Sequence, residues 1–415
     1  MITPYICLLK KRNFSLLWMS QVISQFGDRL TQMALIGLVY EIMPASSFTL
    51  AKVMSIPLIA VFLVSPVAGV YIDRWDKQKT MYISDFLRGI FILLIPVLMV
   101  KFKLMIVLYL LIFLSFCVGR FFIPAKMAII PSLVEKDKII LANSLISTTA
   151  MIAAILGFGV GGIIVEKLGA KIAFFIDSLT FFLSSFLIFF IQPKTRGRFN
   201  PHDFIDLGKY AIKKVKESVL VEMKEGIKYL FSTKETLFAA KVLFSLFSIL
   251  GSLYVVFIVF IQKIFSSKTM DLGYLAVAGG VGLFLGSLIY GRIAKAFFLK
   301  RTVSISLILS SVYLIFFVTF LKVYPFRLFA IFSSFSIGLL ISPIFIAVNS
   351  LIHQESKDIF WGRVFSSLEV VIHFAFLIFM FLSSYLAEKF NPFTIIVSVG
   401  IITFLFSVYN FLKND

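Results

Sequence analysis

Charged residues are scarce in this chain of 415 residues, of which they make up 15%, against about 25% in a typical soluble domain. Acidic residues are the rarest, with 21 Asp and Glu against 40 Lys and Arg. Two cysteines, Cys7 and Cys117, are too few for a disulfide framework, and the three histidines are too scattered to complete a metal site with them. These shortages exclude a water-soluble globule and a disulfide-stabilised secreted domain, and no metal or other cofactor is expected.

Apolar residues are abundant instead, because 60% of the chain is hydrophobic and 50 residues are Phe. This abundance excludes a disordered chain. A bilayer core about 30 Å thick is crossed by a helix of roughly 20 mostly apolar residues. Twelve such runs occur, near residues 14–40, 50–72, 80–100, 104–122, 140–165, 171–191, 237–262, 271–295, 302–321, 326–348, 361–387 and 392–411. The sequence therefore predicts an all-α membrane protein with twelve transmembrane helices.

A polar and basic stretch divides these spans into two groups of six. We expect a six-helix bundle at 1–192, a cytoplasmic basic linker at 193–236 and a second six-helix bundle at 237–415. Within the linker, apolar and charged residues alternate at helical spacing from Gly208 to Ser232, which predicts an amphipathic helix on the membrane surface. Its basic face indicates either a spacer attracted to anionic lipid or a segment that binds a regulator or partner.

The two halves of the chain resemble each other weakly. Ser132-Leu133 matches Ser350-Leu351, and Glu166-Lys167 matches Glu388-Lys389 in the equivalent loop. These matches predict two six-helix pseudo-repeats. Parallel repeats of this kind place a substrate path between the halves, near the membrane midplane. The repeat therefore favours a transporter over a receptor or a membrane enzyme.

Basic residues are distributed unevenly between the two sides of the predicted spans. With the N-terminus in the cytoplasm, nine of the 40 Lys and Arg lie in the opposite loops and four within spans, which leaves 27 on the cytoplasmic side. Positive loops mark the cytoplasmic side of a membrane protein. We therefore expect a multi-pass protein of the cytoplasmic (inner) membrane of a prokaryote, with both termini cytoplasmic. The net charge of +19 is then an orientation signal, and no nucleic-acid partner is expected.

A basic turn between the second and third spans carries a recognisable pattern. It contains Gly69, Asp73, Arg74, Lys77 and Lys79. A glycine lets two helices approach closely, and an acid can stabilise the N-terminus of a neighbouring helix. The pattern resembles the loop signature of the major facilitator superfamily, with Asp76 and Gln78 standing where a glycine and a base are usual.

This resemblance implies the superfamily's fold of two six-helix bundles and its alternating-access activity. We expect the turn, with Asp85 and Arg88 at the start of the third span, to act as a conformational latch that stabilises one conformer and releases in the other. The alternative for Asp85 and Arg88 is an internal ion pair. The second half has Gly286 and Arg292 at the corresponding place but lacks the Asp. This absence weakens the argument for a matching latch in the second half.

Three further stretches, at 121–126, 130–134 and 141–145, resemble the exporter branch of the superfamily that contains macrolide efflux and enterobactin export proteins. Lysophospholipid transporters share part of this pattern. The fifth span contains Gly157, Gly159, Gly161 and Gly162. These are similar to the glycine-rich motif of antiporters, although glycines also serve close helix packing whatever the transport direction. Arg120 is expected at the cytoplasmic end of the fourth span, whereas drug–proton antiporters carry an Arg in its middle.

Ionisable residues inside the spans cost at least about 2.5–3.5 kcal/mol each, so each is a functional candidate. Asp28 is the first candidate for proton or substrate binding, because it lies about 21 Å beyond Phe14 and past the midplane. The alternative for Asp28 is a purely structural pairing. The neighbouring Arg29 points about 100° away around the helix. Asp177 is expected about 9 Å from the outer surface, within reach of water.

Glu369 and His373 form the second candidate site. They are four residues apart and therefore share one face of the eleventh span. A carboxylate beside an imidazole can share or relay a proton, because each moves the other's pKa toward neutrality. The alternative is a satisfied helix-to-helix hydrogen bond.

The chain lacks a phosphate-binding Gly-x-x-x-x-Gly-Lys-Ser/Thr sequence and a recognisable nucleophile–base–acid set, so an enzyme is not expected. We expect a secondary transporter that exports a hydrophobic or amphipathic small molecule, drug-like or siderophore-like, in exchange for protons. The alternatives are a lysophospholipid-type lipid translocator and a non-transporting receptor or scaffold. The expected partners are the small-molecule or lipid substrate, protons as the coupling ion, and membrane lipids. The chain is expected to be a monomer.

Overall fold

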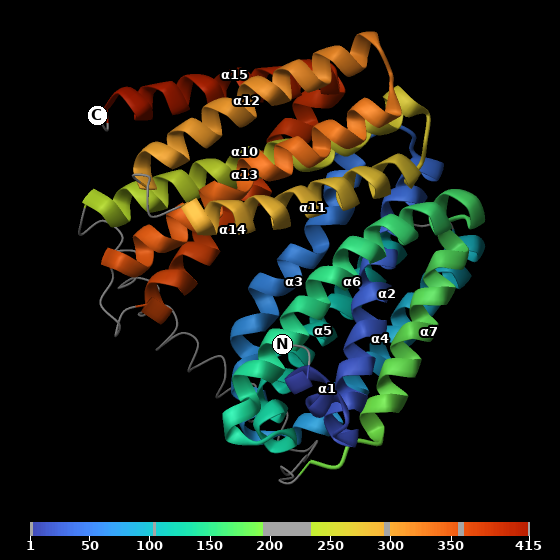
Figure 1. Cartoon of the computed structure of the whole chain (residues 1–415). Coiled ribbons are helices and arrows are strands. Elements are labelled where there is room, and N and C mark those ends of the chain that lie inside the picture. Colours follow the sequence, from blue (N-terminus) through green and yellow to red (C-terminus); the bar gives the residue numbers. More distant parts are fainter. Residues whose placement is uncertain (1–2, 103–104, 194–233, 294–298, 356–360, 414–415) are drawn as a thin grey trace. The chain divides into compact units, whose positions relative to one another are not determined.

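The computed structural model describes residues 3–102, 105–193, 234–293, 299–355 and 361–413, and they are almost entirely helical (Figure 1). These described residues fall into two compact units. The first is drawn from Met1–Leu38 and Val53–Val219, and the second from Val39–Lys52 and Leu220–Asp415. Nearly all of the expected linker, including the amphipathic helix expected from Gly208 to Ser232, lies outside the described residues.

Each span expected from the sequence corresponds to one long helix. The helices of the first half are α1 (Thr3–Leu9), α2 (Arg12–Ile42), α3 (Ser47–Arg74), α4 (Lys77–Phe102), α5 (Met105–Leu133), α6 (Ile139–Leu168) and α7 (Ala170–Phe189), with a short 3₁₀ turn at Lys136–Lys138 before α6. Those of the second half are α10 (Lys234–Phe265), α11 (Met270–Ile293), α12 (Leu299–Val323), α13 (Arg327–Glu355), α14 (Trp361–Lys389) and α15 (Pro392–Lys413).

Eleven of the described helices are long and apolar enough to cross a membrane. The remaining long helix, α2, has 31 residues and stands where the first span was expected, but it carries Asp28, Arg29 and Glu41. Charged groups inside a span are costly, so α2 needs partners for them within the protein. The prediction of an all-α membrane protein built from long spans is confirmed.

The helix α5 is longer than the sequence indicated. The expected span ended at residue 122, whereas α5 continues to Leu133 through Pro124 and Pro131. Proline is tolerated in membrane helices because neighbouring helices and side chains satisfy the backbone groups that it frees. Arg120 therefore lies inside α5, about 22 Å from Met105 at 1.5 Å per residue. The helix thus extends 13 residues beyond Arg120, which was expected at the cytoplasmic end of the span.

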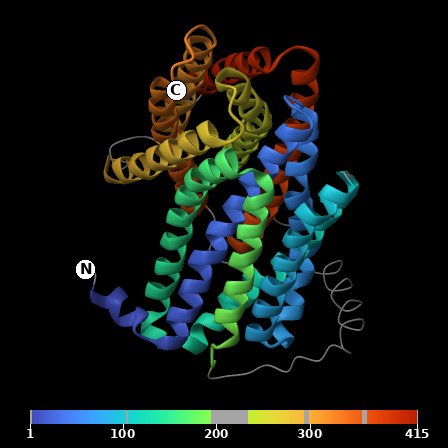
Figure 2. The same cartoon turned by 90° about the vertical axis from the view of Figure 1, so that its right-hand side faces the viewer.

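In the first unit, α4 packs against both α5 and α7, and α6 contacts α7. The long helices of this unit run side by side in both views, and α1 lies at the end where α2 begins (Figures 1 and 2). The core at this end includes Leu8 of α1 with Phe14 and Leu17 of α2, all fully buried. The short α1 is therefore part of the packed unit.

In the second unit, the closest helix pairs include α11 with α13, α10 with α14, and α12 with both α13 and α15. Glycines allow two of these contacts to form backbone against backbone. A Cβ atom added at Gly282 of α11 would overlap the carbonyl oxygen of Phe335, and one added at Gly251 of α10 would overlap that of Phe376. Small residues allow this close approach in membrane helices, where dispersion contacts rather than the hydrophobic effect drive packing.

The turn between α2 and α3 belongs to the second unit by its contacts. Lys268 Nζ donates to Glu41 Oε1 at 2.8 Å. Glu388 Oε1 accepts hydrogen bonds from Ser46 Oγ at 2.6 Å and from the backbone N–H of Phe48 at 3.1 Å. The first turn of α3 is thus fixed to the end of α14 by polar contacts.

Candidate functional site

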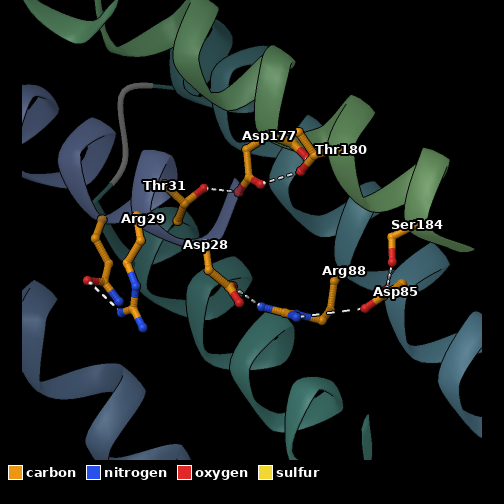
Figure 3. A network of polar contacts seen from close by, with 9 residues as sticks. Asp28, Arg29, Thr31, Asp85, Arg88, Asp177, Thr180 and Ser184 are labelled. Carbon is orange, nitrogen blue, oxygen red and sulfur yellow. Dashed lines mark hydrogen bonds and ion pairs between the residues drawn. The ribbon is translucent and has the colours of Figure 1, made fainter. Parts of the chain in front are cut away.

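Four polar side chains from α2, α4 and α7 form a connected network in the first unit (Figure 3). The Arg88 guanidinium donates to Asp28 Oδ1, and its Nη1 lies 3.8 Å from Oδ1 of Asp85, one turn earlier on α4. Ser184 donates to Asp85 Oδ2 at 2.5 Å. The Asp85 side chain is wholly buried, whereas that of Asp28 is 27% exposed. Asp28 is therefore the acidic member of the network that a proton or ligand can reach.

Arginine suits this central position because its planar guanidinium carries five donors, enough for two carboxylates at once. The face of the Arg88 guanidinium is covered by the ring of Phe181, whose centre lies 4.1 Å away. A buried ion pair persists only when its groups are also hydrogen-bonded. Ser184 supplies such a bond to Asp85. The internal ion pair that was the alternative expectation for Asp85 and Arg88 is present, and Asp28 is a further partner of Arg88.

A third carboxyl group, that of Asp177 on α7, lies beside this network (Figure 3). Thr31 of α2 donates to Asp177 Oδ2, and Thr180 donates to Oδ1 at 3.0 Å. Gly27 permits this approach of α7 to α2, because a Cβ atom there would overlap the side chains of Asp177 and Thr180. Asp177 is completely buried. The expectation that water reaches Asp177 is wrong. It was based on the distance of Asp177 from the end of its own helix, which does not show that α2 covers the side chain.

Two basic residues of α5, Arg120 and Lys126, lie within electrostatic range of Asp28. Lys126 is buried, with 8% of its surface exposed. The Nε atom of Arg120 is buried and has no hydrogen-bond partner within the part of the chain that the structure describes. Arg120 thus adds a second guanidinium group near Asp28. Its proximity to Asp28 was not predicted, because the sequence analysis considered Arg120 only as the end of a span.

Arg29 takes no part in the Asp28–Arg88 contact, and Figure 3 shows its side chain directed away from Arg88. Its Nη1 donates to Gln32 Oε1 at 3.4 Å, and its guanidinium lies 5.3 Å from the centre of the Phe158 ring on α6. The stem of Arg29 packs against Gly157, where an added Cβ atom would lie 2.8 Å from Arg29 Cβ. Arg29 therefore contributes to the contact between α2 and α6.

The glycines expected to pack helices or to support antiport all lie on α6, and all four are buried: Gly157, Gly159, Gly161 and Gly162. Gly157 and Gly161, one turn apart, face α2. An added Cβ atom at Gly161 would lie 3.4 Å from the Cα atom of Leu30. The helix that carries Asp28 is thus held closely against α6 on one side and, through Thr31, against α7 on another.

Glu369 and His373 lie on α14, in the second unit. The Nδ1 atom of His373 lies 2.6 Å from the backbone oxygen of Glu369, and its ring centre lies 5.9 Å from that of Phe247. The Glu369 residue is exposed. The imidazole nitrogen that faces the preceding turn is therefore bonded to the backbone oxygen of Glu369.

The expected latch is partly described. The side chains of Gly69, Asp73 and Arg74 lie outside the described residues; Lys77 is half-buried and Lys79 is exposed. Asp76 Oδ1 accepts the N–H of Lys79 at 2.9 Å, which is the N-cap contact of α4. Gln78 Nε2 donates to the carbonyl oxygens of Ile188 at 3.1 Å and Phe189 at 2.8 Å. Of the two positions that depart from the superfamily signature, Asp76 thus caps the start of α4, and Gln78 fixes that start to the end of α7.

Within the described residues, no group of three or more His, Cys, Asp or Glu side chains could hold a metal ion. The site consists of ion pairs and hydrogen bonds inside helices long enough to span a membrane. Groups of this kind can take up and release protons, and can hold a charged group of a ligand.

A model of the Major Facilitator Superfamily matches residues 17–294, a stretch that includes Asp28, Asp85, Arg88 and Asp177. The chain belongs to the Major Facilitator Superfamily. It is therefore a multi-pass membrane protein and a secondary transporter, not an enzyme, and the alternative of a non-transporting receptor or scaffold is set aside. The resemblance inferred from the turn at 69–79 is confirmed at the level of the superfamily.

Several similar proteins come from Bacillus. "Uncharacterized MFS-type transporter YkuC" of Bacillus subtilis (strain 168) is 25% identical over 98% of this chain and 93% of its own length. "Putative bacilysin exporter BacE" of Bacillus amyloliquefaciens is 30% identical, over 43% of this chain and 44% of its own length. The similarity to BacE thus covers less than half of each protein.

Solved structures share the fold at low sequence identity. A bacterial homologue of the iron transporter ferroportin has a TM-score of 0.71 and 17% identity over 97% of this chain and 98% of its own. A peptide transporter POT in complex with sulfate has a TM-score of 0.71 and 11% identity over 96% of this chain and 94% of its own. These similarities establish the superfamily fold over essentially the whole chain.

Proposed function

We propose that this superfamily member exports a hydrophobic or amphipathic small molecule in exchange for protons, and that Asp28 is the carboxylate that binds the proton. The observation that carries this proposal is the contrast between Asp28, which is 27% exposed, and Asp85 and Asp177, which are completely buried. A coupling group must be reached by protons and must also be linked to the protein around it. Asp28 meets both conditions, because its ion pair with Arg88 connects α2 to α4.

The geometry supports a simple exchange. Protonation neutralises the Asp28 carboxylate and breaks its ion pair with Arg88, which keeps Asp85 as its remaining carboxylate partner. Release of the proton restores the ion pair. Arg120 also lies within electrostatic range of Asp28. A ligand with an anionic group would compete with Asp28 for the same guanidinium groups.

The direction and substrate class rest on similarity. The name of the Bacillus relative BacE refers to export of bacilysin, and the matched segment covers 43% of this chain. The stretches at 121–126, 130–134 and 141–145 resemble the exporter branch with macrolide efflux and enterobactin export proteins. These similarities support an exporter of drug-like, siderophore-like or small antibiotic molecules.

We further propose that the protein is a monomer of a prokaryotic cytoplasmic membrane, with both termini in the cytoplasm. In this arrangement residues 1–192 and 237–415 form the two six-helix bundles and 193–236 the linker between them. The turn at 69–79 acts as a latch together with Asp85 and Arg88, and Glu369 and His373 form a second proton-binding candidate. Bases gathered on the cytoplasmic side support this orientation.

Asp28→Asn tests the proposal in proteoliposomes with an imposed pH gradient, with ethidium and bacilysin as test substrates. The amide cannot take up a proton but keeps the size of the side chain. We expect gradient-driven accumulation to fall to the level of protein-free vesicles. Counterflow of the same substrate, which needs no proton, should persist.

Asp137→Asn is the matched control, because Asp137 is an exposed carboxylate outside the network in the same unit. It should accumulate substrate as the unmodified protein does. Undiminished gradient-driven accumulation in Asp28→Asn contradicts the role of Asp28. Translocation of labelled lysophospholipid without a pH gradient, in the absence of ethidium or bacilysin transport, would favour the lipid translocator instead.

A further inference from the structure

A cavity of about 340 Å³ lies within the second unit, between α10, α14 and α15. Its walls come from 244–252 of α10, 379–386 of α14 and 395–406 of α15. A volume of roughly 300–1,000 Å³ is typical of ligand sites in proteins. All three wall segments lie inside helices that are apolar enough to span a membrane. The cavity is therefore at membrane depth and separate from the network around Asp28.

The cavity is long. Its wall on α15 runs from Ile395 to Phe406, which are eleven positions apart, so at 1.5 Å per residue it is about 16 Å long. This length is about half the thickness of a bilayer core of about 30 Å. The cavity is therefore about as long as one leaflet is thick. A space of this shape suits an extended chain better than a compact ring system.

The walls carry no charged side chain, and three of their buried hydroxyl groups donate to their own helices. Ser248 donates to the carbonyl oxygen of Phe244 at 2.7 Å, Ser383 to that of Met380 at 3.2 Å, and Thr403 to that of Val399 at 2.7 Å. These three hydroxyls thus donate to their own helices rather than into the cavity. The rest of the wall is mostly hydrocarbon, so a strongly polar or charged ligand would lose more hydrogen bonds to water than it could replace here. The cavity therefore selects a hydrocarbon chain.

The cavity opens to the surroundings of the helices through exposed apolar side chains. Phe244 is 42% exposed, Leu382 49% and Ile402 65%, and all three line the cavity. The ring of Phe244 meets that of Phe379 edge to face, with 6.4 Å between their centres. Because these segments lie at membrane depth, the molecules that reach this opening are lipids.

A basic residue marks one end of the cavity. Lys241 precedes Phe244, Ser245 and Ser248 by three, four and seven residues, so it lies on the same face of α10 one turn away. It is exposed, and no ion pair joins it to a carboxylate of the described residues. A lysine at the end of a span can extend toward the headgroup layer, where it attracts anionic lipid.

We propose that this cavity binds one acyl chain of an anionic phospholipid whose phosphate contacts Lys241. The lipid comes from the leaflet at the end of the unit where α10 begins and α15 ends. This is the cytoplasmic leaflet in the orientation given under the proposed function. The site itself needs neither that orientation nor proton coupling, and failure of the Asp28 experiment leaves it untouched.

Native mass spectrometry of the full-length protein tests the site, with phosphatidylglycerol titrated into delipidated protein and phosphatidylethanolamine titrated in parallel. We expect the unmodified protein to retain one phosphatidylglycerol molecule more tightly than the rest. Lys241→Gln should weaken this binding about fivefold and bring it to the affinity for phosphatidylethanolamine. Lys241 is exposed, so this variant leaves the packing of the unit unchanged.

Ser398→Phe tests the chain-binding part, because Ser398 is an exposed residue of the cavity wall and a phenyl ring would fill the space. The tightly bound lipid should be lost. Leu405→Phe is the control: Leu405 is 61% exposed on α15 but does not line the cavity. Equal lipid retention in Ser398→Phe and Leu405→Phe, or an unchanged affinity in Lys241→Gln, would overturn the proposal.

Discussion

Arg88 contacts carboxylates on two helices and an aromatic ring on a third, all in the first unit. Removal of Arg88 would destabilise the protein mainly because it would leave a buried carboxylate without a positive partner. Without the guanidinium, the wholly buried Asp85 would keep its hydrogen bond from Ser184 but lose its positive partner. An uncompensated buried charge costs about 3–5 kcal/mol.

We therefore expect Arg88→Gln to destabilise the protein by about 3–5 kcal/mol, measured as a lower midpoint of thermal unfolding in detergent. The double variant Arg88→Gln, Asp85→Asn should recover more than half of this loss, because it removes the unpaired carboxylate as well. Glu135→Gln is a control at an exposed ion pair of the same unit. A double variant no more stable than Arg88→Gln would show that the Asp85 charge does not dominate the cost.

Single residues also show which parts of the site a sequence can predict. Asp28 and Arg88 were candidates because charges inside apolar runs are conspicuous. Their contact was not predictable, since it joins residues 28 and 88 across two helices whose rotation the sequence leaves open. Asp177 was misjudged for the same reason: Gly27 and Thr31, which cover it, belong to another helix. Nothing in their local sequence indicates that role.

At the scale of helices, the spans were predictable because hydropathy reports burial in lipid directly. Helix ends were predicted less well. Pro124 and Pro131 in α5 read as a helix end by the rules for soluble proteins, yet a membrane helix continues through both. The roles of Asp76 and Gln78 were also missed, because these residues were compared only with a family pattern. Asp76 caps α4, and Gln78 contacts the end of α7, which is more than 100 residues away in the sequence.

Two glycines of α11 give a prediction about helix packing. Gly282→Ala should destabilise the protein by about 1–3 kcal/mol, because the added methyl group would overlap the Phe335 carbonyl and lie 3.1 Å from the Leu339 nitrogen. Gly291 has no atom within 4 Å of the same added group. Gly291→Ala should therefore be neutral, or stabilising by up to about 1 kcal/mol through helix propensity.

The measurement is the thermal unfolding midpoint of the two variants, purified in parallel in one detergent. The two changes are chemically identical and lie on one helix, so their difference isolates the contact with α13. Equal midpoints would mean that α11 and α13 can separate without loss of stability.

At the scale of the whole molecule, the distribution of charge predicts orientation. Cys7 is exposed on α1 and Cys117 lies in α5. In a Cys117→Ser background, a membrane-impermeant maleimide should label Cys7 only after the cells are permeabilised. Tyr324, exposed between α12 and α13, should be labelled in intact cells when replaced by cysteine in the background Cys7→Ser, Cys117→Ser. Labelling of Cys7 in intact cells would reverse the proposed orientation.

The turn between α2 and α3 has a consequence for fragments of this protein. Glu41, Ser46 and the N–H of Phe48 come from the first fifty residues, yet their partners Lys268 and Glu388 lie in the second half. A fragment that starts at α10 would therefore lack part of its own compact unit. We expect the two halves, expressed as separate polypeptides, to accumulate only when produced together, because the second half needs a hairpin that the first half encodes.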